Sequence, residues 1–293
     1  MYRKIYTLLF LFILIFTKSA FSAPAFSTSD PGIWGEGVLS YDSMFSPVFS
    51  ILVQDQSYKF PEQIERFVAV KPDDTNKEER HYEKKRSSKL DYTSIEAMAG
   101  VKLWDRILFY GLIGRADVTF NYKYSDTSMP VKTLSVNEQF EPDESLIFGG
   151  GIAGTIYDKS YKEFIERVKF GFDARYRQIS FRTDWIEEGT KFYKTYLNEY
   201  QLALIAGITI DYFNPYFGFR VSNTIGRETY ALQDNEISSG YTVSTVYDES
   251  VDTQKNMGWV YGASFSIFDK GSINLDARTG DESSYGISAS IKF

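Results

Sequence analysis

His81 is the single histidine of the chain, and histidine is the side chain that most often serves as a general base. It stands in the charged run 78–86, where no partner of fixed position is indicated. We therefore interpret it as a solvated loop residue rather than as a catalytic base. The chain has no cysteine, which excludes a thiolate nucleophile and a thiolate metal site. We predict no catalytic residue, no metal site and no cofactor.

Acidic side chains gather in stretches between the apolar segments, and carboxylates are the ligands that Ca²⁺ and Mg²⁺ prefer. No ligand spacing recurs among them, so we interpret them as solvated loop surface. The basic run 84–86 carries charge that suits anionic lipopolysaccharide, and it is also typical of a solvated loop. The glycine run 149–151 lacks the Lys-Ser/Thr of a phosphate loop, and we predict a strand there. The acidic stretches are Asp73 and Asp74, Glu141, Asp143 and Glu144, Glu187 and Glu188, and Asp248 and Glu249.

Charged side chains also recur at every second position of strand-like segments, opposite a face of apolar and aromatic residues. A charge facing lipid at the bilayer midplane costs about 2–4 kcal/mol, so this face suits the interior of a membrane barrel. Two interpretations remain: the charges pair and fill a narrow interior, or an excess of basic side chains lines an anion-preferring pore. The predicted lumen-lining residues are Lys102, Arg115, Asp117, Arg167, Lys169, Asp173, Arg175, Arg177, Arg220, Asp276 and Arg278.

The segments that carry this alternation form four hairpins. A final strand at about 283–293 and an opening strand at about 32–45 complete ten. Eight strands would result if the opening strand and one other failed, and twelve if the segment 67–70 paired within the first long loop. The hairpins are 95–103 with 108–120, 146–156 with 168–176, 202–210 with 217–221, and 260–267 with 273–278, with turns at 104–106, 157–160, 214–215 and 269–271.

Short turns alternate with long polar connections at about 46–90, 124–144, 184–197 and 232–256. Outer-membrane barrels show this asymmetry, with short periplasmic turns and long extracellular loops. We therefore predict an all-β fold: one closed antiparallel transmembrane β-barrel, with ten strands as the preferred number.

The N-terminal segment 1–22 is typical of a secretory signal peptide. Arg3 and Lys4 form a basic start, 8–16 is unbroken apolar sequence, and Ala20 and Ser22 suit a cleavage site after Ser22. We predict a signal peptide at 1–22 and a barrel domain at 23–293. No later stretch is apolar for the roughly 18 residues of a membrane helix. The net charge of −7 argues against a nucleic-acid partner.

The C-terminal strand places Tyr285, Ile287, Ala289, Ile291 and Phe293 on one face and ends on the aromatic residue. Together with the signal peptide, the hairpins and the loop asymmetry, this resembles the small bacterial outer-membrane β-barrel superfamily of opacity-type and porin-like surface proteins. The resemblance implies an outer-membrane location and insertion by the barrel-insertion machinery, which reads this terminal pattern. It also implies contact with outer-membrane lipid and lipopolysaccharide.

Three functions follow from this architecture. The first is a non-enzymatic outer-membrane surface protein that presents long polar loops to an unknown extracellular ligand. The second is a narrow porin or channel for small solutes, including anions, which the basic interior favours. The third is an outer-membrane hydrolase, which the single histidine disfavours.

Overall fold

The computed structural model describes residues 45–70, 79–104, 106–126, 137–140, 144–161, 164–183, 190–237, 241–252, 257–267, 271–280 and 282–292. The predicted signal peptide and most of the predicted opening strand lie outside these ranges. Within them the chain is all-β, and ten antiparallel strands close into one barrel. In ring order these strands are β1 (Phe45–Lys59), β13 (Glu282–Lys292), β12 (Gly271–Thr279), β11 (Met257–Ile267), β9 (Phe213–Ile237), β8 (Thr190–Thr209), β7 (Arg167–Thr183), β6 (Glu144–Ser160), β4 (Ile107–Asp126) and β3 (Glu79–Leu103).

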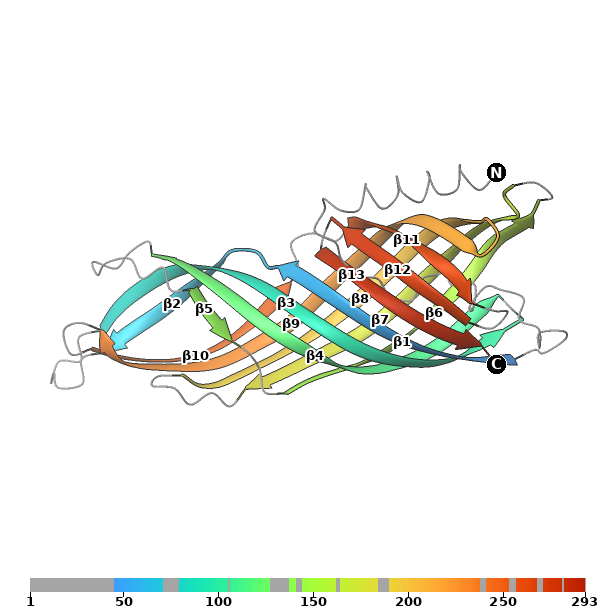
Figure 1. The fold of residues 1–293 in the computed structure, drawn as a ribbon. Helices are drawn as coiled ribbons and strands as arrows, with labels where there is room; N and C mark the ends of the chain where they lie inside the picture. Colours follow the sequence, from blue (N-terminus) through green and yellow to red (C-terminus); the bar gives the residue numbers. More distant parts are fainter. Residues whose placement is uncertain are drawn as a thin grey trace.

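Three further strands extend the barrel at one end (Figure 1). β2 (Gln63–Val70) pairs with the N-terminal part of β3, and β10 (Tyr241–Asp252) pairs with the C-terminal part of β9. β2 and β10 meet each other at Ala69 and Val70. β5 (Asn137–Phe140) adds a short pairing to β4. We call the end of the barrel that carries β2, β5 and β10 the extended end. We call the opposite end, where β13 finishes, the short-turn end.

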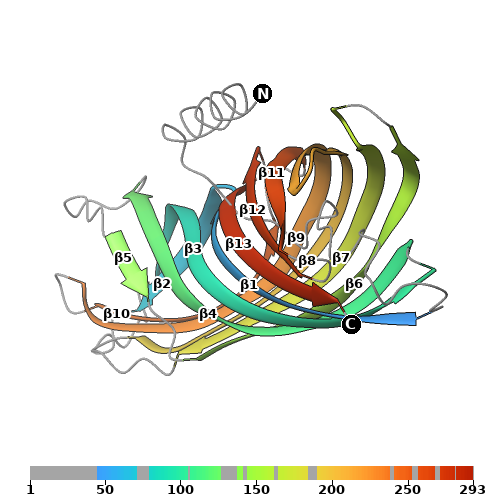
Figure 2. The same cartoon turned by 45° about the vertical axis from the view of Figure 1, so that its right-hand side comes forward.

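The barrel wall has very different heights on its two sides, as Figure 2 shows. β11, β12 and β13 have 11, 9 and 11 residues, whereas β3 and β9 have 25 each. A membrane strand needs about 9–11 residues. The short strands therefore have the length of a bilayer crossing, and the long strands continue well past it.

The predicted opening strand is misplaced. The first barrel strand in the described part of the chain is β1, which lies within the predicted first long loop and pairs with β13 and β3. Both of its faces are apolar near its start, with Val48 and Leu52 inside and Phe49 and Ile51 outside, so its alternation is weak in sequence. The segment 67–70 does pair within that loop, as part of β2, but it extends the wall and leaves the ring at ten.

The connections at the short-turn end correct two predicted turns. The turn at Trp104 is where we expect it, closed by a hydrogen bond from the Arg106 amide to the Leu103 carbonyl at 2.9 Å. The predicted turn 214–215 lies inside β9, and the chain reverses instead at Asp211 and Tyr212. Asp211 adopts the left-handed backbone conformation that a tight two-residue turn needs, with φ of 52°. The predicted turn 157–160 lies within β6, and the reversal comes between residues 161 and 166.

Most of the predicted long connections are strands as well. Much of 46–90 forms β1, β2 and the N-terminal half of β3. Much of 232–256 forms β10 and the C-terminal end of β9. Polar residues on both faces gave these segments the composition of loops, but they pair with their neighbours along almost their whole described length.

The outer face of the ring is apolar near the short-turn end and polar beyond it. On β1, Phe49, Ile51 and Val53 are 49%, 59% and 38% exposed, and the next outward position is Asp55. Asp55 pairs in register with Thr93 of β3, which in turn pairs with Asp117 of β4. Monomeric soluble proteins rarely expose apolar patches that surround the molecule. We call the apolar part the outer apolar band.

Aromatic side chains border this band on both sides. At the short-turn end the exposed residues are Trp104, Tyr157, Tyr161 and Tyr212. At the other border Tyr176 of β7 and Tyr200 of β8 lie side by side, with ring centroids 5.2 Å apart. Membrane barrels carry such aromatic girdles at the two lipid–water interfaces.

Candidate functional site

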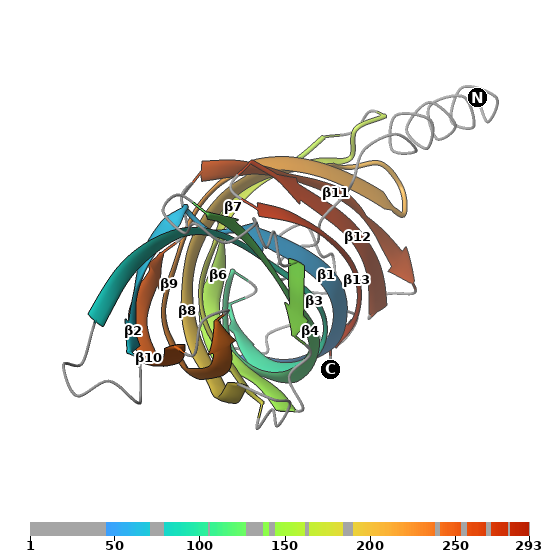
Figure 3. The same ribbon diagram turned by 90° about the vertical axis from the view of Figure 1, so that its left-hand side faces the viewer.

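The barrel interior holds most of the predicted lumen-lining residues. Viewed along the barrel, the strands enclose this interior on all sides (Figure 3). Their alternation sends every second side chain inward. The predicted residues that are buried inside are Lys102, Lys169, Asp173, Arg175, Arg177, Arg220, Asp276 and Arg278.

Arg115 and Asp117 are placed wrongly by the sequence prediction. Both are exposed on the outer face of β4, in line with Ile113, which is 61% exposed. The inward residues of β4 are apolar, Leu112 and Val118 among them. β4 carries large apolar residues on both faces, so the face with the charged residues was wrongly assigned to the interior. Asp117 lies where the outer face has turned polar, in register with Thr93, and Arg115 lies at the border of the outer apolar band, in register with Ile95.

Arg167 lies at the short-turn end, where it pairs with Asp158. Its Nε and Nη2 donate to the two carboxylate oxygens at 2.6 and 2.7 Å. Both side chains are 25% exposed, so this pair belongs to the rim of the barrel rather than to its interior.

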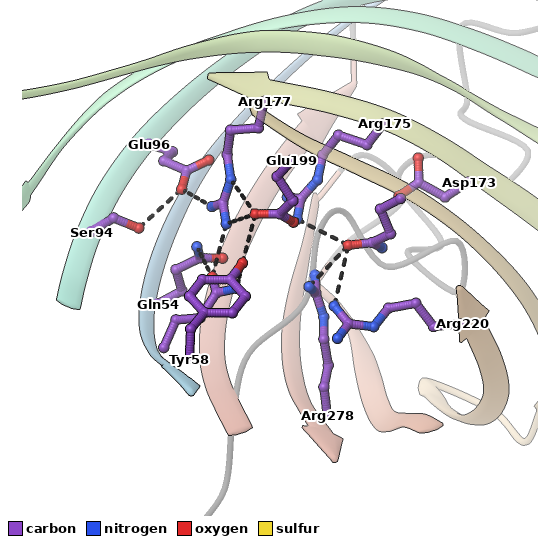
Figure 4. Close-up of polar contacts among 12 residues, drawn as sticks. Gln54, Tyr58, Ser94, Glu96, Asp173, Arg175, Arg177, Glu199, Arg220 and Arg278 are labelled. Atoms are coloured by element: carbon purple, nitrogen blue, oxygen red, sulfur yellow. Dashed lines mark hydrogen bonds and ion pairs between the residues drawn. The ribbon is translucent and has the colours of Figure 1, made fainter. Parts of the chain in front are cut away.

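A buried layer around Arg177 crosses the interior (Figure 4). Arg177 of β7 donates from Nη1 to Glu96 of β3 and from Nη2 to Glu199 of β8, each at 2.6 Å. The three side chains are 0%, 2% and 1% exposed. Ser94 adds a hydrogen bond to Glu96 at 2.9 Å. We call Glu96, Arg177 and Glu199, with the residues that bond to them, the Arg177 layer.

One hydrogen bond of this layer crosses the full diameter of the barrel. Tyr58 of β1 donates to Glu199 of β8 at 2.7 Å. β1 and β8 lie five strands apart in either direction around the ring of ten. Tyr92 lies between them: it accepts from Arg177 at 2.6 Å and donates to Gln56 at 2.6 Å. Side chains from opposite walls thus meet at the centre, and the Arg177 layer closes the interior at this level.

A second group of arginines adjoins this layer. Arg175, Arg220 and Arg278 come from β7, β9 and β12, and all three donate to the side-chain oxygen of Gln201 on β8. The distances are 3.1, 3.4 and 3.0 Å. Figure 4 shows the three guanidinium groups turned toward one another. We call these three residues the three-arginine cluster.

Tyr110 and Asp173 form a further polar contact inside the barrel, at 2.7 Å. Tyr110 lies on β4 and Asp173 on β7, with β6 between them. This approach requires glycine on β6, since a Cβ on Gly151 would lie 2.5 Å from the Tyr110 hydroxyl. The glycine run is therefore a strand with close packing, as the sequence suggests.

The interior differs on the two sides of the Arg177 layer. Toward the extended end, Ile147, Ile179 and Leu197 face inward in register on three neighbouring strands, and each is fully buried. Toward the short-turn end, the inner face of β12 and β13 carries small polar residues. These are Ser272, Asn274, Ser288 and Ser290.

The sequence prediction missed several residues of the site. Glu199 and Gln201 are central to it, and their signal is present: they alternate with the outward Leu202 and Leu204 along β8. Gln56 and Tyr58 were not predicted as interior residues because the sequence analysis assigned the segment of β1 to a loop.

His81 lies in β3, where it pairs with Val68, rather than in a loop. Of the terminal pattern, Tyr285, Ile287, Ala289 and Ile291 are exposed on the outer face, and Phe293 is outside the described residues. Among the residues that the structure describes, no group of three or more His, Cys, Asp or Glu side chains is arranged to hold a metal ion. In the same ranges, no helix is long and apolar enough to span a membrane.

No protein-family model matches the chain, and no curated protein matches it. Among solved structures, the transport unit of the autotransporter AIDA-I from Escherichia coli is 10% identical, with a TM-score of 0.28 over 88% of this chain and 91% of that one. The translocator domain of the autotransporter NalP from Neisseria meningitidis is 10% identical, with a TM-score of 0.26 over 87% and 90%. The Pseudomonas putida toluene transporter TodX is 9% identical, with a TM-score of 0.27 over 94% of each chain. Similarity this low leaves the function to be argued from the residues of this chain.

Proposed function

We propose that the protein is a non-enzymatic outer-membrane surface protein, in which a sealed barrel anchors a β-sheet extension outside the cell. The proposal includes three expectations from the sequence. These are the relation to the opacity-type superfamily that the terminal strand indicates, the signal peptide and the outer-membrane location. The outer apolar band and its two aromatic borders support a membrane-embedded barrel.

The observation that carries the proposal is the hydrogen bond from Tyr58 to Glu199 across the barrel diameter. A barrel that conducts solutes needs a free path along its axis, and this contact obstructs it together with the Arg177 layer. About eight strands leave room only for side chains, whereas 16–18 enclose an aqueous channel. The ten-stranded ring lies near the small end of that range.

The extension is the part of the molecule that this proposal assigns to recognition. On β3 the outer face turns polar at Thr93, and the strand continues to Glu79 at its far end. At about 3.3 Å per residue, these 14 residues add about 45 Å of strand beyond the outer apolar band. β9 extends in the same direction, and β10 and β2 pair between it and β3. A passive anchor would not require strands of this length.

The absence of cysteine from the chain allows a direct test of this arrangement. Lys59→Cys places a thiol on the exposed outer face toward the extended end, and Tyr212→Cys places one at the short-turn end, where Tyr212 is 73% exposed. In intact cells, a membrane-impermeant maleimide is expected to label Lys59→Cys at once. It should label Tyr212→Cys only after the outer membrane is permeabilised. Equal labelling of both variants in intact cells, or the reverse order, would contradict the proposal.

A narrow anion channel is the second candidate, and one observation favours it. Among the described buried residues, six basic side chains stand against four acidic ones. Under this alternative the Arg177 layer would have to open, and the protein would show anion-selective conductance in a planar bilayer.

A further inference from the structure

The barrel wall is interrupted between the short strands and the extended end. The pairing of β13 with β1 reaches only as far as Glu282, and β11 begins at Met257. Farther toward the extended end, β2 and β10 pair with each other in two residue pairs, the first of which joins Ala69 to Val243. Between these two levels, the described part of the chain places no strand between β2 and β10 (Figure 1). We call this interruption the wall opening.

Both sides of the wall opening are strand edges. Over 244–252, β10 has β9 as its single strand partner among the described residues. Over 63–68, β2 pairs in the same way with β3 alone. A strand edge presents a row of backbone N–H and C=O groups that another chain can pair with. The nine residues of β10 offer about 30 Å of such an edge.

The edge of β10 is better suited to pairing than the edge of β2. Pro61 directly precedes β2, and proline is one of the residues that block an edge because it has no N–H to donate. β10 has no proline and no glycine, and it is rich in Val, Thr and Tyr, which favour strands. The longer and more regular edge therefore belongs to β10.

The width of the wall opening limits what can enter it. At the end of the short strands, β12 and β13 separate β1 from β11, so the two sides are three strand spacings apart, or about 14 Å. The width falls to one spacing where Ala69 meets Val243. One inserted strand needs two spacings, or about 10 Å. A single extended segment fits this space, whereas the closed wall of a second barrel does not.

The charge around the wall opening selects the kind of segment. In the described residues of its rim, which are 60–68, 244–252, 279–280 and 282, acidic residues outnumber basic ones six to one. Like charges on facing strands disfavour pairing, so β10 is poorly matched to a second β10. Opposite charge favours the encounter and the pairing, which indicates a basic partner. The acidic residues are Glu62, Glu65, Asp248, Glu249, Asp252 and Glu282, and the basic one is Arg66.

We propose that the edge of β10 binds one extended, basic segment of a partner protein by β-strand addition within the wall opening. Backbone hydrogen bonds to β10 provide affinity, and the acidic rim provides preference for a cationic sequence. This inference rests on the proposed function for its biological setting, since it names the partner of an extension that lies outside the cell. The binding step itself can be measured in detergent, where the orientation in the membrane does not matter.

The first test uses a fluorescein-labelled nine-residue peptide in which Lys alternates with Val and Thr. Its fluorescence anisotropy is expected to rise saturably with the detergent-refolded barrel at low ionic strength. The same peptide with Glu in place of Lys should bind at least about tenfold more weakly. Alternate N–H groups of a strand point to the same side, so N-methylation of one alternate set of residues should abolish binding and methylation of the other set should leave it intact.

The second test changes the rim. The double variant Asp248→Lys with Glu249→Lys is expected to weaken binding of the Lys peptide by about tenfold. The matched control is Asp117→Lys with Glu166→Lys, which changes the net charge equally at exposed positions outside the wall opening. Because the chain has no cysteine, Thr245→Cys on β10 should also form a disulfide with a peptide that carries a central Cys. Thr119→Cys on β4 should not.

Three outcomes would overturn the proposal. One is a folded wild-type barrel that does not bind the Lys peptide saturably. Another is equal binding of both N-methylated peptides, which would indicate attraction by charge without strand addition. A third is an equal loss of binding in the control double variant. Maleimide labelling of Lys59→Cys and Tyr212→Cys in cells reports the orientation separately, so a failed titration with the expected labelling overturns this inference and not the proposed function.

Discussion

Arg177 and Arg278 are both fully buried arginines of one barrel interior, yet their surroundings differ in kind. Arg177 lies between two carboxylates, each at 2.6 Å. Its guanidinium carbon lies 5.7 Å from the centroid of the Tyr92 ring. Arg278 donates to the side-chain oxygen of Gln201, which also accepts from Arg175 and Arg220. Two buried arginines of the same barrel thus donate to different kinds of acceptor, carboxylates in one case and a shared amide oxygen in the other.

A buried charge with a full set of partners holds opposing walls together, and removing it leaves those partners with the full cost of burial. We therefore assign the Arg177 layer to closing the barrel.

The largest effect is expected from Arg177→Met. This substitution preserves much of the side-chain volume but leaves Glu96 and Glu199 buried without their common partner. Breaking a buried ion pair from one side costs about 3–5 kcal/mol. The free energy of unfolding, measured by tryptophan fluorescence in lipid vesicles with urea, should fall by that amount. A loss below about 1 kcal/mol would mean that the layer does not hold the walls together.

A smaller loss is expected from Glu96→Gln. The amide keeps the shape of the side chain and can still accept from Arg177, which retains Glu199 as a charged partner. A weakened buried hydrogen bond to a charged group costs about 1–3 kcal/mol. The same unfolding measurement, made beside Arg177→Met, should rank the two variants in this order.

Arg167→Met tests whether geometry alone explains the effect. Arg167 binds Asp158 through two nitrogens at 2.6 and 2.7 Å, a geometry as good as that of Arg177. The pair is partly exposed at the barrel rim, where ion pairs contribute about 0.2–1 kcal/mol. The unfolding free energy should change by no more than this. A loss equal to that of Arg177→Met would show that burial is not what distinguishes the two arginines.

The sequence alone predicted the fold class well, because strand alternation is a local signal. The ten-strand closed barrel follows from hairpins such as 202–210 with 217–221, in which apolar and polar residues alternate cleanly. The prediction failed where both faces of a strand are apolar, as at Val48 and Phe49 of β1. It failed again on β4, where Arg115 lies on the outer face at the border of the outer apolar band, so its charge says nothing about the interior.

The contacts of the site were beyond reach for a different reason. Alternation tells which side chains point inward, but not which of them meet across the interior. Tyr58 and Glu199 are 141 residues apart, and their contact depends on ring order and on the stagger of the strands. The same stagger decides which arginine of β7 lies between Glu96 and Glu199. Arg177 bonds to both at 2.6 Å, whereas Arg175, two residues earlier on the strand, bonds to Glu199 at 3.2 Å.

The most direct test of the sealed barrel is a planar-bilayer recording of the refolded wild type beside a variant in which Glu96, Arg177 and Glu199 are all replaced by serine. This triple replacement removes the Arg177 layer without leaving an unpaired charge among its three members. Heat-modifiable migration on a gel serves as the control that both proteins are folded. We predict a silent wild type and discrete conductance steps in the variant. Discrete steps of equal size in both proteins would contradict the account.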